Sequence, residues 1–266
     1  MTKSPVSSWA PSHLSYPPGV TSTAEVGNIG TGRPTTDLAL GLADLHLAHS
    51  PGDVVHIRLD PVGDAGWTLE RADDLLVGAG FVPDTVSWCD DGRVEVVATR
   101  IRSLPDTVAP GLRLLVVGLN PSPSSADTAV GFHRAGNRFW PAVLEAGLAS
   151  IDREPRSALH DHGLGMTDLV RRTTSRADEV SADEYRRGAE RVGRLVEWLR
   201  PLAVCFVGLG GWRTVVDRHA VAGVQERCFG GRPVYLMPHT SGLNTHSRLA
   251  DLVEHLESAG HLADRA

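Results

Sequence analysis

Short apolar runs that alternate with helical patterns constrain the fold of this chain most strongly. Residues 113–118, 202–207 and 233–237 are runs of strand length that are rich in Val and Leu. Around them, apolar residues recur at spacings of three and four, as on one face of a helix. Strands that alternate with helices form a mostly parallel sheet with helices on both faces. The sequence therefore predicts an α/β fold, a three-layer α-β-α sandwich with a short, mostly parallel central sheet.

The helices of this part carry start signals. Asn137 could cap a helix whose apolar face begins at Phe139. Ser181 and Glu184 have the spacing of a capping box, in which the two side chains bond each other's backbone amides. We expect one helix after each signal and a last helix over residues 249–256.

The first 110 residues have a different character. Residues 1–35 are rich in Pro, Ser, Thr and Gly, which predicts a disordered N-terminal tail. Residues 36–105 predict a helix, a strand at 54–59, a second helix and a hairpin, and thus a small α/β segment that precedes the larger fold. This order resembles the final portion of a class I methyltransferase domain without its glycine-rich cofactor loop. We therefore interpret the segment as a methyltransferase-like remnant and expect no methyl transfer.

Composition excludes several classes of site. Cys89, Cys205 and Cys228 lie far apart, show no zinc-ligand spacing and are too few for a four-cysteine iron–sulfur cluster. No run of 18 apolar residues is present, and the N-terminus lacks the apolar core of a secretory signal. We expect no metal, no cofactor, no membrane span and a cytoplasmic location.

Charge is distributed unevenly along the chain. The net charge is −6, but residues 1–109 carry seven Lys and Arg against fourteen Asp and Glu, whereas the remainder is close to neutral. Seven arginines of one stretch could line a phosphate-facing surface: Arg171, Arg172, Arg176, Arg186, Arg187, Arg191 and Arg194. Acidic residues are interleaved with them, which favours the alternative of an ion-paired helix face.

Two polar loops follow predicted strands. The loops span residues 118–125 and 238–246. Ligands of open α/β sheets bind beyond the carboxyl ends of the strands. If the two strands are neighbours, Asn120 and His239 approach one pocket.

These loops carry a specific resemblance. The segment GLNPSPSSADTAVGFHRAGNRFW resembles the first motif of mismatch-specific uracil/thymine DNA glycosylases, and MPHTSGLNTHS resembles their second motif. Between them, GMTDLVRRTTSRADEVSADEY is similar to the family's G-x-T-x-L-V-x-R-x-T stretch. The resemblance implies a uracil-DNA glycosylase-like domain over residues 110–258.

The resemblance implies catalytic and base-binding roles. Asn120 would position the attacking water; the alternative is an Asx-turn residue. His239 stands where the family usually has Asn, and its imidazole could donate a hydrogen bond to the uracil O2. Phe132 would stack on the flipped pyrimidine, and Asn137 would bond the base edge or cap its helix. The further substrate-binding candidates are Leu119 and Ser125.

The resemblance also implies a DNA-contacting surface. Leu243 would be the wedge that fills the space left by the flipped base. Thr245 stands where the family often has an Arg that contacts the widowed guanine. The complete set of expected DNA-binding residues is Ser124, Ser241, Gly242, Leu243, Asn244 and Thr245.

Together these features predict a monofunctional DNA glycosylase of base excision repair. It would release uracil, and possible further bases such as thymine or ethenocytosine, opposite guanine in duplex DNA. The expected partner is double-stranded DNA with G:U or G:T mispairs, and the expected oligomeric state is a monomer. The only lysine is Lys3, in the N-terminal tail, so we expect no covalent Schiff base. The alternative is a non-catalytic or very slow DNA-binding member of the same superfamily.

Overall fold

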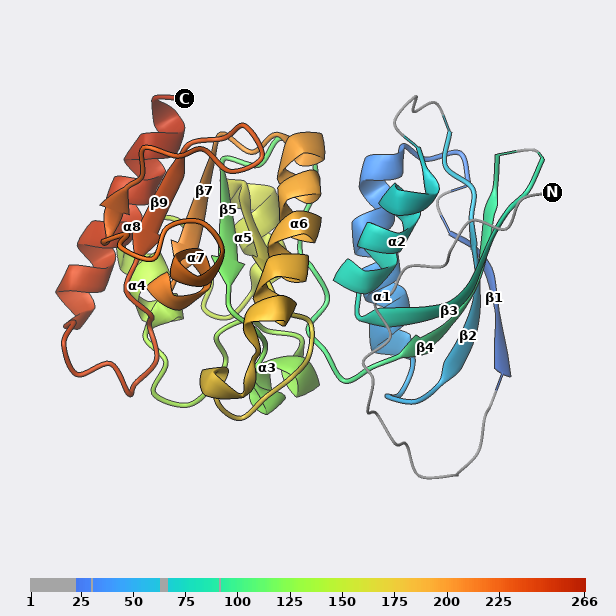
Figure 1. Ribbon diagram of the computed structural model, residues 1–266, viewed down its shortest axis with the longest axis horizontal. Coiled ribbons are helices and arrows are strands. Elements are labelled where there is room, and N and C mark those ends of the chain that lie inside the picture. The colour runs from blue at the N-terminus through green and yellow to red at the C-terminus, as the bar shows by residue number, and fades with distance from the viewer. Residues whose placement is uncertain (1–22, 30, 63–66, 91) are drawn as a thin grey trace.

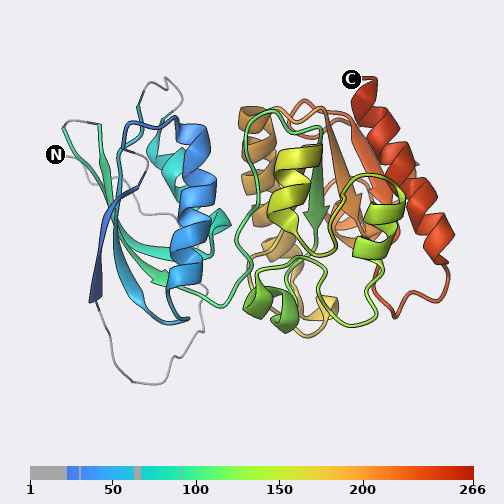
Figure 2. The same ribbon diagram turned by 180° about the vertical axis from the view of Figure 1, so that it is seen from behind.

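The computed structural model describes residues 23–29, 31–62, 67–90 and 92–266. They form two units, each with its own sheet, joined by the segment 101–113 (Figures 1 and 2). Within the described residues, every helix is too short or too polar to span a bilayer.

The N-terminal unit is a four-stranded sheet with two helices on one face (Figure 1). Its strand order is β1-β2-β4-β3; β1 runs parallel to β2, and the other pairs are antiparallel. The predicted helix, strand, helix and hairpin follow in the expected order. The elements are β1 (Thr23–Ile29), α1 (Leu38–Ala48), β2 (Val54–Leu59), α2 (Leu69–Gly78), β3 (Phe81–Trp88) and β4 (Val94–Arg100).

Strand β1 corrects the prediction of a disordered tail through residue 35. Residues 23–29 pair with β2, with Thr23 opposite Val54 and Ile29 opposite Leu59. The composition of the segment suggested disorder, but a strand edge elsewhere in the chain satisfies its backbone. The prediction for residues 1–22 lies outside the described residues.

The larger unit has the predicted three-layer architecture. Its sheet has the order β6-β5-β7-β9-β8, and every neighbouring pair is parallel except the short β8 against β9. The strands are β5 (Leu114–Gly118), β6 (Leu164–Asp168), β7 (Ala203–Val207), β8 (Gly223–Val224) and β9 (Val234–Met237). Strand β6 was not predicted, although it lies in the segment that carries the middle motif.

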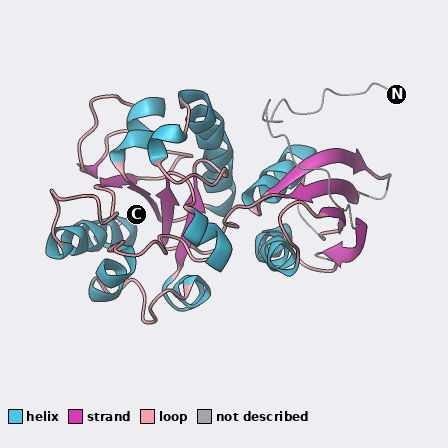
Figure 3. Cartoon of the chain, turned by 90° about the horizontal axis from the view of Figure 1, so that it is seen from below, coloured by secondary structure: helices cyan, strands magenta, loops and turns pink. Residues whose placement is uncertain are grey.

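Helices cover both faces of this sheet (Figures 2 and 3). One face packs against α4 (Phe139–Glu145), α5 (Pro155–His162) and α8 (Leu249–Asp264), and the other against α6 (Ala182–Leu199) and α7 (Leu209–Val215). The short α3 (Pro123–Thr128) follows β5. Helix α6 starts with the predicted capping box of Ser181 and Glu184.

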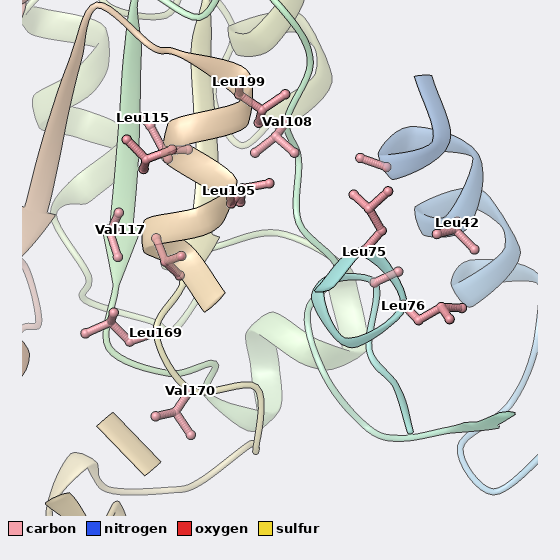
Figure 4. Packing of buried hydrophobic residues seen from close by; sticks show 14 of the residues in the cluster. Leu42, Leu75, Leu76, Val108, Leu115, Val117, Leu169, Val170, Leu195 and Leu199 are labelled. Carbon is pink, nitrogen blue, oxygen red and sulfur yellow. The ribbon is translucent and has the colours of Figure 1, made fainter. Parts of the chain in front are cut away.

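The two units share a junction of apolar contacts and ion pairs. One cluster of buried apolar side chains extends from Leu75 and Leu76 of α2 to Leu195 and Leu199 of α6 (Figure 4). Carboxylates of the first 109 residues also pair with arginines of the larger unit. These pairs are Asp44–Arg156, Asp74–Arg194 and Asp106 with both Arg171 and Arg191.

Most arginines of the arginine-rich stretch are therefore engaged in ion pairs and do not form a free basic surface. Besides the three arginines in the junction, Arg172, Arg176 and Arg186 pair with Glu184, Asp178 and Asp183. Of the seven, Arg187 alone has no ion pair within the described part of the chain.

Candidate functional site

Strands β5 and β9 run in the same direction, so their carboxyl ends lie at one edge of the sheet (Figure 1). Asn120 follows β5 by two residues and His239 follows β9 by two residues, so both are at this edge. Their strands, β5 and β9, are not direct neighbours, because β7 lies between them. Strand β7 is followed by Gly208, which has a φ of +96°. A Cβ at Gly208 would lie 3.4 Å from the His239 Cβ and 3.6 Å from Leu119 Cδ1. A residue without a side chain therefore lets the two loops approach each other across β7.

The carboxamide of Asn120 is held in one orientation. Its Nδ2 donates to the Arg172 carbonyl at 3.1 Å and to Thr174 Oγ1 at 2.7 Å. A carbonyl can only accept, so these contacts identify the nitrogen and the oxygen of the amide. Asn120 is half-buried, and its Oδ1 has no hydrogen bond to any described residue. The site thus presents one fixed acceptor at the end of β5.

The chain after β6 extends the backbone ladder beside Asn120. The amides of Leu169 and Val170 donate to the carbonyls of Gly118 and Leu119 at 3.0 and 2.9 Å, and Thr174 N donates to Pro121 O at 3.2 Å. These bonds join the loop that follows β5 to the segment that follows β6.

Phe132 lies beside the end of β5 in a strained conformation. Its φ is +58°, which is unusual for a residue with a side chain, and its ring stacks on Phe139 with centroids 4.0 Å apart. A Cβ on Gly118 would lie 3.5 Å from Phe132 Cζ and would collide with Asp168 Oδ1. Glycine at position 118 is thus needed to let both side chains reach this edge. Such strain is typical of functional sites.

Asp168 is a site residue that the sequence analysis missed. It ends β6, is 7% exposed, and its Oδ2 has no hydrogen-bond partner within the described residues. Burial raises the pKa of this carboxyl to about 6, although the positive charge of Arg171 opposes the rise. Its position at the end of a parallel strand was the available signal, but no strand was predicted there.

Arg138 joins the two predicted motifs and was also missed. Its guanidinium donates to the carbonyls of Asn244 at 2.7 Å, Ser241 at 3.3 Å and Ser247, and its backbone amide donates to Thr240 O at 2.9 Å. The second loop is therefore fastened to the start of α4.

Asn137 lies one residue before Arg138, the N-cap residue of α4, and its side-chain oxygen bonds the backbone at the start of the helix. Its Oδ1 accepts a hydrogen bond from Phe139 N at 2.9 Å. Helix α4 thereby begins at the residue on which Phe132 stacks, so Asn137 contributes to the position of that ring.

The second loop exposes some predicted residues and buries others. Leu243 is 77% exposed, and Gly242 and Thr245 are exposed beside it. Asn244 is buried instead, because its Nδ2 donates to His239 O at 2.8 Å and to Ser247 Oγ at 3.1 Å. Ser241 Oγ accepts from Leu243 N at 3.2 Å. The internal polar contacts hold a loop whose apolar tip faces solvent.

The predicted residues of the first loop are mainly structural. Ser125 is 3% exposed and accepts from His133 N, while Ser124 Oγ and His133 Nδ1 share a hydrogen bond of 2.7 Å. The Leu119 side chain packs under α7, where a Cβ on Gly211 would lie 2.9 Å from it. These side chains take part in turns and packing.

His239 presents a neutral imidazole at this edge. Its side chain is exposed, and partial burial followed by the charge of Arg138 lowers the pKa of the ring below 6.5. At pH 7 the ring therefore carries one N–H donor and one acceptor nitrogen.

A cavity between the two units adjoins the residues that hold Asn120. Its volume is about 700 Å³, and it is lined by residues such as Asp73, Val77, Thr173 and Gly188, but not by Asn120, Phe132 or His239. Among the described residues, no group of three or more His, Cys, Asp or Glu side chains is arranged to hold a metal ion.

Comparison with known proteins gives a family match over the larger unit. The family model described as "Uracil DNA glycosylase superfamily" matches residues 105–259. Among solved structures, the chain is similar to a solution NMR structure from Methanosarcina acetivorans described as a "putative Uracil DNA glycosylase". The identity is 20%, the match covers 60% of this chain and 97% of that one, and the TM-score is 0.44. The family match spans more than half of the chain and includes both loops.

Proposed function

The chain belongs to the uracil DNA glycosylase superfamily, and from this premise we propose that it hydrolyses the N-glycosidic bond of uracil opposite guanine in duplex DNA. Thymine and ethenocytosine opposite guanine are the further candidate bases. The fixed carboxamide of Asn120 carries the proposal. Its nitrogen is bonded to Arg172 O and Thr174 Oγ1, which leaves Oδ1 to accept a hydrogen bond from water.

In this mechanism the base leaves the stack before the bond breaks. Flipping costs a few kcal/mol, and least for a mispaired base, which favours G:U over A:U. Leu243 is the apolar side chain on the second loop that would enter the stack, and its 77% exposure fits that role. Phe132, supported from behind by Phe139, would receive the flipped pyrimidine on its free face.

Bond cleavage then separates charge. The C1′–N1 bond breaks with its electron pair on the base, and the sugar becomes cationic. The water held by Asn120 Oδ1 adds to C1′ and loses a proton, and the uracil anion takes up a proton as it leaves. A carboxamide is too weak a base to take the proton, so the rate comes from placement of the water and from stabilisation of both charges. The neutral His239 ring would donate its N–H to the uracil O2. The products are an abasic site and free uracil, with the strand intact.

Single-turnover uracil release tests the proposal. Excess enzyme is mixed with a G:U duplex, and Asn120→Ala should slow release on the order of 10²-fold because the water loses its position. Gln225→Ala is the matched control, since that carboxamide also bonds two backbone carbonyls but lies beside β8. Its rate should equal that of the wild type.

The substrate panel decides the finer assignment. It comprises single-stranded U, A:U, G:U, G:T and ethenocytosine opposite guanine. Fastest release from G:U supports mismatch-directed action. Tight binding of duplex DNA without release of any base would overturn the proposal in favour of a non-catalytic member of the superfamily.

A further inference from the structure

The segment 171–174 lies between Asn120 and the end of the N-terminal unit. Its even residues face Asn120: Arg172 O and Thr174 Oγ1 accept from the carboxamide. Its odd residues face residues 102–103, because Thr173 Oγ1 donates to Arg102 O at 2.8 Å and Ser103 Oγ donates to Arg171 O at 2.7 Å. The segment 171–174 thus contacts residues 102–103 on one side and the Asn120 carboxamide on the other.

Ser103 is itself fixed by the core of the N-terminal unit. Its side chain is fully buried, and its carbonyl accepts a hydrogen bond of 3.1 Å from His46 Nε2 of α1. Burial, followed by the charges of Arg100 and Arg171, lowers the pKa of His46 to about 3. The ring is therefore neutral, and because a carbonyl can only accept, its proton lies on Nε2.

A second contact holds the loop that carries Asn120. The guanidinium of Arg102 pairs with Asp127 of α3, at 2.7 Å from Nε and 2.5 Å from Nη2. Both side chains are about half exposed, so this pair contributes little energy. The buried contact of Ser103 is the stronger restraint.

We propose that the N-terminal unit positions the Asn120 carboxamide, with Ser103 and Thr173 as the positioning residues. The inference rests on the proposed function and assigns the N-terminal unit a role in that reaction. Neither side chain touches the substrate in this scheme; both act through the backbone of residues 171–174. Displacements of about 1 Å can cost on the order of 10²-fold in rate, so loss of these contacts should be measurable.

Two hydroxyl deletions in the full-length protein test the proposal. Thr173→Val keeps the shape of the side chain and removes its donor, and Thr173→Ser retains the donor. Thr173→Val should lower the single-turnover rate about tenfold, whereas Thr173→Ser should keep it within about threefold of the wild-type rate. Ser103→Ala should lower the rate by about 10- to 100-fold. The dissociation constant for duplex DNA should change less than about twofold. Thr214→Val is the matched control, because this hydroxyl donates to Gly210 O at 2.8 Å on α7.

A second measurement does not depend on catalysis. The side-chain amide signal of Asn120 in an NMR spectrum is assigned by its absence in Asn120→Ala. Hydrogen exchange of this amide should accelerate in Thr173→Val and Ser103→Ala but not in Thr214→Val. Absence of uracil release by the wild type would refute the proposed function, and this measurement would still decide the positioning role. Unchanged exchange in Thr173→Val, or equal losses of rate and DNA affinity, would overturn the inference.

Discussion

Replacement of Asp168 by Asn should stabilise the protein at neutral and alkaline pH. Burial raises the pKa of the carboxyl from 3.8 to about 6, so its charged form is disfavoured in the folded state. The rise corresponds to about 3 kcal/mol, and the group is fully buried, so solvent screening does not reduce it. Asn has a similar shape and cannot ionise. Asp168→Asn should therefore remove this cost.

The sign follows from the proton count. Between pH 3.8 and about 6 the folded chain holds a proton at Asp168 that the unfolded chain has lost. The folded state binds more protons, so stability falls as pH rises through this window. Asp168→Asn should accordingly differ from the wild type by less than about 1 kcal/mol at pH 4 and by about 3 kcal/mol at pH 8.

Urea unfolding followed by tryptophan fluorescence at both pH values measures this difference. Asp152→Asn is the control, because that carboxylate is exposed and pairs only with its neighbour Arg153. Its free energy of unfolding should change within about 0.5 kcal/mol at either pH. A gain for Asp168→Asn that is equal at pH 4 and pH 8, or a loss at pH 8, would refute the reasoning.

Three loop substitutions and one salt titration test further parts of this interpretation. In Asn120→Asp, an oxygen would replace the nitrogen 3.1 Å from Arg172 O, so the new carboxyl should have a raised pKa. Stability relative to wild type should then fall with rising pH, by about 1–3 kcal/mol at pH 8 in urea unfolding; a pH-independent difference would contradict this. Leu243→Ala should change the free energy of unfolding by less than about 0.5 kcal/mol. It should slow uracil release from duplex DNA more than release from single-stranded DNA. Equal slowing on both substrates would argue against a wedge. His239→Ala should slow uracil release more than it weakens DNA binding. Because the pKa of His239 is lowered, the wild-type rate of release should fall only below pH 6.5. A decline of the rate that begins above pH 7 would contradict this assignment. Six of the seven clustered arginines are ion-paired. The affinity for duplex DNA should therefore fall less than about 50-fold between 50 and 200 mM salt. A fall on the order of 10³-fold would indicate instead that these arginines contact phosphates.

Local patterns predicted the elements whose signals are local. Strand β2 has its predicted bounds, and the capping box of α6 forms between the predicted side chains. Strands β1 and β6 were missed because their evidence lies elsewhere in the chain. Strand β1 depends on pairing with β2, and β6 contains Gly165, Thr167 and Asp168, which weaken an apolar pattern.

At the site, too, local patterns predicted some features, and contacts between distant parts of the chain decided the others. The sequence predicted that the two loops meet only if their strands are neighbours, and the structure instead lets them approach each other across Gly208. Motif spacing could not predict that β7 lies between them, or that Arg138 fastens the second loop to α4. The contact between Asn120 and Thr174 spans 54 residues, and no local rule relates such positions. Ser125 and Asn244 belong to the expected motifs, yet their polar groups hold the loops from within.

The uneven charge along the sequence is explained by the junction between the units. The acidic first part supplies Asp44, Asp74 and Asp106, and the larger unit supplies the arginines that pair with them. Within the described residues, Asp106 is the carboxylate that pairs with the buried Arg171 and Arg191, so a chain beginning at residue 110 would leave both guanidinium groups buried without it. Removal of one partner from a buried pair costs about 3–5 kcal/mol. The boundary expected at residue 110 therefore cuts through the core of the larger unit, and the family match, which begins at residue 105, includes the carboxylate that this core requires.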